Sequence, residues 1–266
     1  ELTSEDYAGA GDDRAMIAMN RQAIGFARDA VQEYGIRPDY FNPMGKVNGA
    51  ASAVADAHNR SYAAHLATLD EPSERLDARQ MTELTGSRHY VSGLFTPGTV
   101  MLQPAGYVRG LAAGLAEQIA LYENSPVTGF QPQGADWRVT TPKGTINTGR
   151  IILANNGHLE SFGFARGRLM QLFLFASMTP ELDLEALAAL GGQSRWGVTP
   201  SDPMGTTMRR IDSGQGGNRI VTRTCAVLRP GMRTSAGDLR RASSVQRAKF
   251  DQRFPVLAGM RMAMEW

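Results

Sequence analysis

An ordered series of patterns between residues 104 and 157 constrains the fold most strongly. Small residues with one apolar face predict a helix over Pro104–Ala120. Alternating residues on both sides of the turn Thr141–Gly144 predict a β-hairpin. The apolar run Arg150–Ala154 predicts a buried strand that ends in the turn Asn155–Gly157. A helix, a hairpin crossover and a return strand are typical of an open α/β sheet, where ligands bind at the carboxyl edge.

The rest of the chain mixes helical and strand patterns. Further helices are expected over Ala15–Tyr34, Ser52–Leu69, Ala78–Thr85 and Asp238–Arg253. Further strands are expected over Asp39–Asn42, Gly45–Gly49, Tyr90–Phe95, Leu121–Asn124, Val127–Gln131, Leu169–Pro180, Gly205–Ile211, Arg219–Ala226 and Leu257–Glu265. These patterns predict an α+β fold with a mixed, largely antiparallel sheet and flanking helices.

Composition excludes several classes of protein. The chain of 266 residues is 42% hydrophobic and 20% charged, which is a globular composition. A single cysteine, Cys225, excludes an internal disulfide framework and a cysteine-rich zinc site. The four histidines show no metal-ligand spacing, so no metal site is expected. No apolar run reaches the roughly 20 residues that span a bilayer, and no membrane association is expected.

Charge is divided unevenly along the chain. The net charge is +2, but Arg195–Trp266 alone carries 13 basic and 5 acidic residues, a local excess of +8. Such an excess attracts an anionic ligand, or it reflects solvent-facing arginines that pair with the acidic remainder; both interpretations stay open. Aromatic residues are too sparse in this segment to favour nucleic acid as a partner.

Two glycine-rich segments were candidates for phosphate loops. Gly9-Ala10-Gly11 is followed by Asp12 and Asp13, whose carboxylates would repel a phosphate. The second segment, Gly214–Gly217, lies between two strand patterns and predicts a hairpin turn. Neither segment has the spacing of a dinucleotide-binding fingerprint.

Three motifs carry a resemblance to a known family. Pro104–Leu111 is similar to a P-x-x-Y-V-x-G-L segment, Ser125–Thr128 to T-P-V-T, and Leu153–Gly157 to L-A-T-N-G. In this order they resemble the FAD-dependent amine and amino-acid oxidoreductases of the D-amino-acid/glycine oxidase (DAO) superfamily, and within it most closely the glutamylputrescine oxidoreductase group. The later segments Trp196–Pro200 and Phe254-Pro255 follow the order of the family's substrate domain.

The chain also departs from the family pattern. Gln103 stands where relatives commonly carry His, and Asn155 where they carry Thr. Neither the family's amino-terminal G-x-G-x-x-G unit nor its carboxy-terminal flavin segment is found in the sequence. The expectation is therefore an internal fragment of a longer enzyme, one that binds FAD weakly by itself.

The resemblance implies a domain arrangement within an α/β FAD-binding fold. Residues 1–38 would be a helical segment that adjoins the FAD domain. Residues 39–99 and 161–266 would form the two parts of the substrate domain, and residues 100–160 a partial FAD-domain segment with a β-hairpin crossover.

The resemblance also implies FAD as cofactor and a C–N bond as the site of oxidation in a small amine or amino acid. It assigns Val127 and the segment Ala154, Asn155, Asn156 and Gly157 to cofactor binding. No catalytic residue is assigned, because the cofactor carries the chemistry. The expected compartment is cytoplasmic, and the sequence leaves the oligomeric state open. The alternative is a non-catalytic binding or assembly module derived from such an enzyme, which visible absorbance by bound flavin would exclude.

Three arginines are candidates for binding a substrate carboxylate: Arg209, Arg210 and Arg223. A guanidinium binds a carboxylate through two parallel hydrogen bonds. The alternative for each is a solvent-facing position on an antiparallel sheet. Strand alternation places Arg209 and Arg210 on opposite faces, so at most one of them lines a pocket on a given side.

Overall fold

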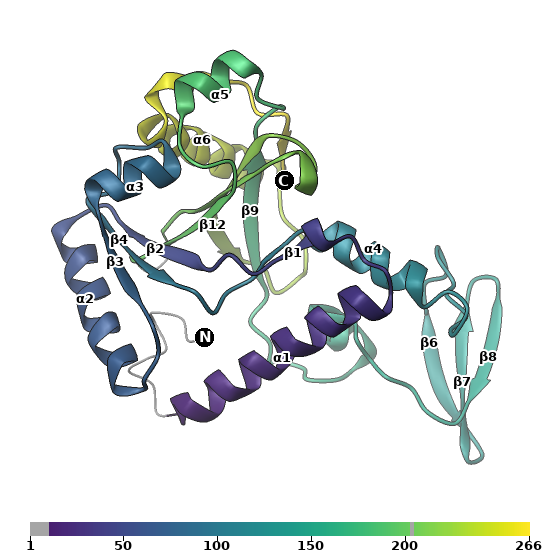
Figure 1. Cartoon of the computed structure of the whole chain (residues 1–266). Helices are drawn as coiled ribbons and strands as arrows, with labels where there is room; N and C mark the ends of the chain where they lie inside the picture. The colour runs from purple at the N-terminus through teal and green to yellow at the C-terminus, as the bar shows by residue number, and fades with distance from the viewer. Residues whose placement is uncertain (1–10, 203–204) are drawn as a thin grey trace. The chain divides into compact units, whose positions relative to one another are not determined.

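The computed structural model describes residues 11–202 and 205–266 (Figure 1). The chain divides into two compact units. Unit 1 contains the described residues up to Gly114, together with Leu174–Val227 and Ser235–Trp266. Unit 2 contains Leu115–Phe173 and Leu228–Thr234.

Unit 1 holds the α-helices. They are α1 (Asp13–Glu33), α2 (Ala53–Thr68), α3 (Ala78–Thr85), α4 (Pro104–Gly114), α5 (Leu184–Leu190) and α6 (Ala236–Arg253), with the 3-10 turns η1 (Pro38–Tyr40), η3 (Ser213–Gln215) and η4 (Pro255–Leu257). Five of the α-helices begin at a side chain that accepts a hydrogen bond from the first turn: Asp12, Ser52, Asp77, Asp183 and Ser235. Each cap satisfies a backbone N–H that the helix itself leaves without a partner.

The main sheet has eight strands in the order β13-β9-β12-β11-β10-β2-β4-β3. Their bounds are β2 (Lys46–Ala50), β3 (Glu74–Asp77), β4 (Ser92–Thr96), β9 (Leu172–Met178), β10 (Trp196–Pro200), β11 (Thr207–Ile211), β12 (Arg219–Leu228) and β13 (Met264–Glu265). The β10–β2 pair is parallel, and β10–β11, β11–β12, β2–β4 and β3–β4 are antiparallel. A separate antiparallel pair joins β1 (Phe41–Asn42) to β5 (Met101–Leu102).

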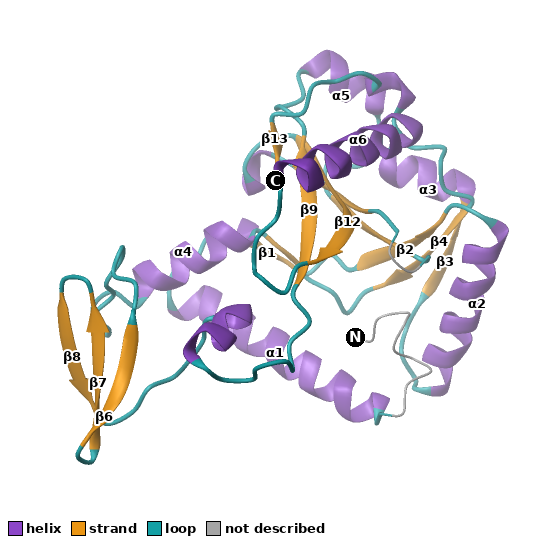
Figure 2. Ribbon diagram, turned by 180° about the vertical axis from the view of Figure 1, so that it is seen from behind, coloured by secondary structure: helices purple, strands orange, loops and turns teal. Residues whose placement is uncertain are grey.

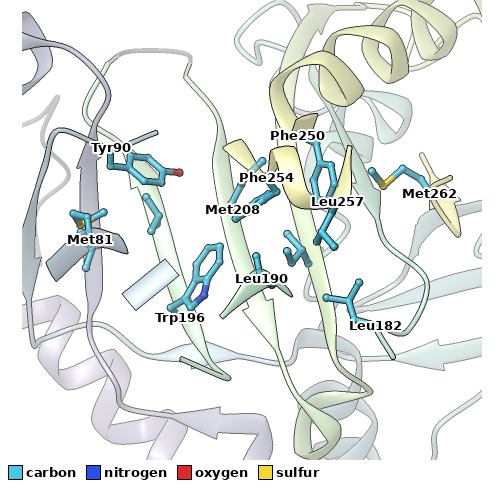
Figure 3. Close-up of a cluster of buried hydrophobic side chains, with 13 residues drawn as sticks. Met81, Tyr90, Leu182, Leu190, Trp196, Met208, Phe250, Phe254, Leu257 and Met262 are labelled. Atoms are coloured by element: carbon cyan, nitrogen blue, oxygen red, sulfur yellow. The ribbon is translucent and has the colours of Figure 1, made fainter. Parts of the chain in front are cut away.

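One face of the sheet is closed by the helices α3, α5 and α6 (Figure 2). Trp196 and Met208 of the sheet, Met81 of α3 and Phe250 of α6 belong to one buried cluster there (Figure 3). All four side chains are at most 1% exposed. Burial of such large apolar side chains stabilises the fold by about 1.5–3 kcal/mol each, so this cluster anchors unit 1.

The opposite face is covered at its β4 end by α1 and α2. Leu94 of β4 packs there with Ile17, Tyr62 and Leu66. This face also holds a buried polar pair, in which the Asn59 amide donates to the Asn48 carbonyl over 2.9 Å. The same sheet therefore has two differently covered faces.

Unit 2 is built around a small three-stranded sheet. It contains β6 (Gly129–Gln133), β7 (Asp136–Thr141), β8 (Gly144–Thr148) and the 3-10 segment η2 (Asn156–Phe162). Both strand pairs are antiparallel. The residues between β8 and η2 form no strand.

The structure confirms several predicted elements. The fold is α+β with a mixed, largely antiparallel sheet and flanking helices. Asp77 caps α3 through a reciprocal capping box, and Gly86 ends it in a left-handed conformation with φ of 75°. The hairpin turn at Thr141–Gly144 and the turn between β11 and β12 also lie where the sequence predicts them.

Four predicted elements are wrong or too long. The helix predicted to reach Ala120 ends at Gly114, whose missing side chain allows the backbone to pass against Tyr34. No strand forms over residues 121–124, and the strand predicted over Leu257–Glu265 reduces to η4 and the two-residue β13.

The fourth is the predicted buried strand Arg150–Ala154, which is neither buried nor a strand. Ile152 is 91% exposed. Within the described residues the segment pairs with no other strand, and an apolar run forms a sheet only beside such a neighbour.

Candidate functional site

Unit 2 contains a cavity of about 500 Å³. Its lining includes Val127, Ala154 and Asn155, three of the residues assigned to cofactor binding from the sequence. Val127 precedes β6 and is 41% exposed. The apolar walls and a few polar groups are typical of a small-molecule site.

Asn155 is the polar residue of this cavity with unsatisfied hydrogen-bonding groups. Its side-chain Nδ2 and Oδ1 are both buried, and neither has a hydrogen-bond partner among the described residues. An amide provides two donor hydrogens and one acceptor. Because an unpaired buried polar group costs about 1–3 kcal/mol, a polar ligand group at Asn155 would be stabilising.

Asn156 and Gly157 follow the cavity-lining residue Asn155 in the sequence and are the first two residues of η2. Asn156 adopts a left-handed conformation with φ of 49°. The Gln171 side chain donates to the Gly157 carbonyl over 3.0 Å. A Cβ at Gly157 would lie 2.5 Å from Gln171 Oε1, so a larger residue here would require the Gln171 side chain to move. Neither Asn156 nor Gly157 is among the cavity-lining residues.

Two aromatic residues of the cavity were missed by the sequence analysis. Phe130 and Phe162 both line it, and their rings are stacked with centroids 5.6 Å apart. Aromatic side chains at a cavity can stack against a planar heterocycle. The sequence signal that could have indicated an aromatic cavity is the pair Phe162 and Phe164, which lies shortly after the turn at Asn155–Gly157.

The main sheet of unit 1 carries the three candidate arginines. Arg209 pairs in register with Gly197 of β10 and Val221 of β12. Its guanidinium donates to the Leu102 carbonyl over 3.1 Å. Burial lowers the pKa of Arg209, and no carboxylate of the described residues lies within 4.0 Å of it. Arg209 is thus a partly buried cation without a counter-charge on the described chain.

Arg210 lies on the opposite face, as strand alternation predicts. It pairs with Trp196 and Ile220, both in the buried cluster, and is itself 5% exposed. Its Nη1 donates to the Gly191 carbonyl over 2.6 Å, and burial lowers its pKa. This position ties β11 to the end of α5.

Arg223 lies on the same face as Arg209 and is exposed. It is opposite Thr207 in the sheet and donates to the Thr207 hydroxyl over 3.3 Å. The structure therefore brings Arg209 and Arg223 to one face and separates Arg210 from both.

Arg195, in contrast to Arg209, is paired with carboxylates of the chain. It bridges Asp39 and Asp212, with both N–O distances at 2.6 Å. These two carboxylates raise the pKa of Arg195, and the same contact lowers the pKa of Asp39. Arg209 has no such pair.

Membrane and metal features were sought in the same part of the chain. Over residues 11–202 and 205–266, no helix has the length and apolarity needed to cross a membrane. The same residues contain no group of three or more His, Cys, Asp or Glu side chains that could hold a metal ion.

Comparison with known proteins identifies the family. The family described as FAD dependent oxidoreductase (DAO) matches residues 3–266. The chain therefore belongs to this family of FAD-dependent oxidoreductases. A curated relative, the "Probable oxidoreductase OrdL" of Haemophilus influenzae, is 23% identical over 153 residues, which is 56% of this chain and 36% of that protein.

Solved structures show the same fold. Glycine oxidase from Geobacillus kaustophilus matches with a TM-score of 0.72 at 14% identity, over 99% of this chain and 68% of that one. L-proline dehydrogenase from P. horikoshii matches with 0.68 at 15% identity, over 93% and 64%. L-amino acid deaminase from Proteus vulgaris matches with 0.65 at 15% identity, over 98% and 65%. The chain thus spans about two thirds of these solved chains, and its match to the curated relative covers about a third of that protein.

The unit 2 cavity fits part of the family's cofactor. FAD carries a planar adenine, a ribose and two phosphates. Phe130 and Phe162 provide aromatic side chains for a planar group, and the buried Asn155 amide has a donor and an acceptor without partners among the described residues. These residues suit a nucleotide better than an entirely apolar ligand.

Proposed function

We propose that the protein oxidises a C–N bond of an amine or amino acid that carries a carboxylate. The observation that carries this proposal is Arg209, a partly buried cation with no carboxylate partner among the described residues. A substrate carboxylate would supply the missing counter-charge and accept two hydrogen bonds from the guanidinium. Family membership and the amino-acid-directed neighbours support this substrate class.

The cofactor would be held in part by unit 2. Val127, Ala154, Asn155, Asn156 and Gly157 are the residues that we assign to it, with Val127 acting through backbone atoms. When bound, FAD supplies the acceptor for the hydride that leaves the substrate carbon beside nitrogen, and the resulting imine is hydrolysed by water. The protein's own part is to bind, orient and desolvate.

Arg209 would orient the substrate through its carboxylate. Its neighbour in register is Gly197, which has no side chain to occupy the space beside the guanidinium on this face. Arg223 lies on the same face and adds positive charge at the surface. Arg210 donates to a backbone carbonyl in the closed interior and serves the fold in this account.

The finer substrate assignment follows the resemblance to the glutamylputrescine oxidoreductase group. In this reading the carboxylate and the reacting nitrogen are separated by a carbon chain, as in a carboxylated polyamine. An α-amino acid is the other candidate, and the names of the three structural relatives favour it.

The experiment is a substrate panel with product detection. The purified protein is incubated with α-amino acids, carboxylated polyamines and matched amines without a carboxylate, and the carbonyl product is trapped with a hydrazine. We expect product from a carboxylated member and at least about tenfold less from its uncarboxylated match. Equal turnover of both would contradict a carboxylate clamp.

The cofactor assignment has its own test in a pair of variants. Val127→Ile should leave flavin content nearly unchanged, since it preserves the backbone. Val127→Pro should lower it, because proline has no N–H and fixes φ. Flavin content is measured from visible absorbance per protein, and equal retention in both folded variants would contradict the assignment.

A further inference from the structure

Several arginines of unit 1 lie on the face of the main sheet that is turned away from α3, α5 and α6. Side chains alternate along a strand, so residues 219, 221 and 223 of β12 share one face. Arg209 of β11 is opposite Val221 in register and lies on that face too. Arg219 and Arg223 each lie two residues from Val221, at positions diagonal to Arg209. Such diagonal neighbours have Cα atoms about 7–8 Å apart, so the three arginines share one region of the face.

The chain supplies carboxylates to the arginines at one end of these strands. Arg219 is the first residue of β12, and its Nη2 lies 3.9 Å from Glu181 Oε2. Arg195 precedes β10 and bridges Asp39 and Asp212. Both cations thus have counter-charges within the chain.

Arg209 and Arg223 have no such partners. Among the described residues, no carboxylate lies within 4.0 Å of either guanidinium group. Arg209 donates to the Leu102 carbonyl over 3.1 Å, which is an uncharged acceptor. Arg223 donates to the Thr207 hydroxyl over 3.3 Å, which is uncharged as well. Two neighbouring cations without counter-charges repel each other, so an anion that reaches both would be stabilising.

Both side chains are accessible to a solute. Arg223 is exposed and Arg209 is partly exposed. A guanidinium group has five N–H donors, and the bonds to Leu102 and Thr207 leave most of them for a ligand. A carboxylate accepts two parallel hydrogen bonds from such a group. Each arginine can therefore bind one carboxylate, and their diagonal positions allow one molecule to bring both.

We propose, resting on the proposed function, that the substrate carries two carboxylates, one bound by Arg209 and the other by Arg223. The substrate class is then that of acidic amino acids and of other amines with two carboxylates on a short carbon chain. Arg209 binds the carboxylate that all the candidate substrates share. Arg223 is a specificity-determining residue, because it favours those with a second carboxylate over those with one.

The test uses two ligands that cannot be oxidised at a C–N bond of an amine. Glutarate has two carboxylates, and in glutaramate one of them is replaced by an amide of similar shape. Ligand-observed NMR on the purified chain at low ionic strength should give a dissociation constant of about 1 mM or below for glutarate. Glutaramate should bind at least about fivefold more weakly, because it lacks the second charge-assisted pair of hydrogen bonds.

Variants of Arg223 assign this preference to one side chain. Arg223→Met should lower it to about twofold, because either carboxylate of glutarate can still bind Arg209. Arg223→Glu places a negative charge there and should make glutaramate the better ligand. Arg79→Met is the matched control, since it removes an arginine from α3, where Arg79 is exposed and paired with Glu83. It should leave the preference unchanged, and circular dichroism checks that each variant is folded.

Three binding results would overturn the proposal. One is no detectable binding of glutarate up to about 10 mM. Another is the same preference for glutarate in the wild type, in Arg223→Met and in Arg223→Glu. The third is an equal loss of preference in Arg79→Met and Arg223→Met, which would assign the effect to net charge.

Turnover separates this inference from the proposed function. Oxidation of amines with one carboxylate, with no gain for matches that carry two, would refute the inference and leave the proposed function standing. Glutarate binding with the expected response to the Arg223 variants, but no oxidation of any amine, would support the pair of arginines as a dicarboxylate site and refute the proposed function.

Discussion

Arg209 and Arg210 are consecutive residues of one strand, yet they lie in opposite environments. Arg210 faces the side closed by α3, α5 and α6, where the residue is 5% exposed and its guanidinium donates to the Gly191 carbonyl. Arg209 faces the other side, beside Gly197, and donates to the Leu102 carbonyl. The period of two along a strand produces this difference.

One sheet thus serves two purposes. On its closed face, buried large apolar side chains such as Trp196 and Phe250 stabilise the fold. Its other face carries a cation whose counter-charge is not provided by the described chain. Stability and the proposed substrate binding should therefore respond to different substitutions, which four predictions examine.

The largest effect is expected on the closed face. Phe250→Ala removes a fully buried ring from the cluster and should lower the free energy of unfolding by about 3–5 kcal/mol. Denaturant unfolding followed by circular dichroism measures this. Phe26→Ala, at a residue that is 65% exposed, is the control and should change stability by less than about 0.5 kcal/mol. A similar loss in both variants would contradict the assignment of the core.

The next effect concerns the face that carries Arg209. Arg209→Met should weaken apparent binding of a carboxylated substrate by about 2–4 kcal/mol, seen as a rise in KM, because it removes a charge-assisted pair of hydrogen bonds. Binding of the uncarboxylated analogue should change little. Arg210→Met is the matched control and should leave both KM values unchanged; if it raises KM as much as Arg209→Met does, the two faces do not differ as described.

A smaller effect involves pH and His89. Burial, with Arg253 and Lys249 nearby, lowers the pKa of His89 to about 4. The folded state therefore binds this proton more weakly than the unfolded state, whose histidine pKa is about 6.5, so stability is lost as pH falls from about 6.5 towards 4. Because His89 is partly exposed, the loss should be about 1–2 kcal/mol. Denaturant unfolding at several pH values measures it, and a His89→Gln variant with the same pH dependence would contradict the assignment.

The smallest effect concerns the capped amino terminus of α3. Asp77→Ala removes the capping box of α3 and should lower stability by about 1 kcal/mol. Asp77→Asn preserves an acceptor for the helix amide and should recover most of it. Thermal unfolding of the two variants compares them, and an equal loss in both would assign the effect to charge and not to capping.

The sequence predicted correctly those elements whose ends depend on residues within one turn of the chain. Asp77 and Gly86 fixed both ends of α3 because a side-chain acceptor and a left-handed glycine act within one turn of chain. The opposite placement of Arg209 and Arg210 likewise follows from strand geometry alone. The same local signals bound α5, with Asp183 before the helix and Gly191 after it.

The missed features depend on contacts between distant residues. The run Ile151–Leu153 has the composition of a buried strand, but composition does not reveal whether a neighbouring strand is present. The cavity of unit 2 depends on Phe130 and Phe162 meeting across 32 residues of sequence. No periodicity encodes such a meeting, so the aromatic wall was found only in the structure.

The central claim is that the protein is a flavoprotein reduced by carboxylated amines, and an anaerobic absorbance titration tests it most directly. The purified protein is scanned in the visible range before and after addition of substrate without oxygen. With FAD added in excess, we predict that its absorption bands are bleached by a carboxylated amine at concentrations that leave the bands intact with its uncarboxylated match. No bleaching of the added FAD by any carboxylated amine of the panel, or equal bleaching by both members of a pair, would contradict this claim.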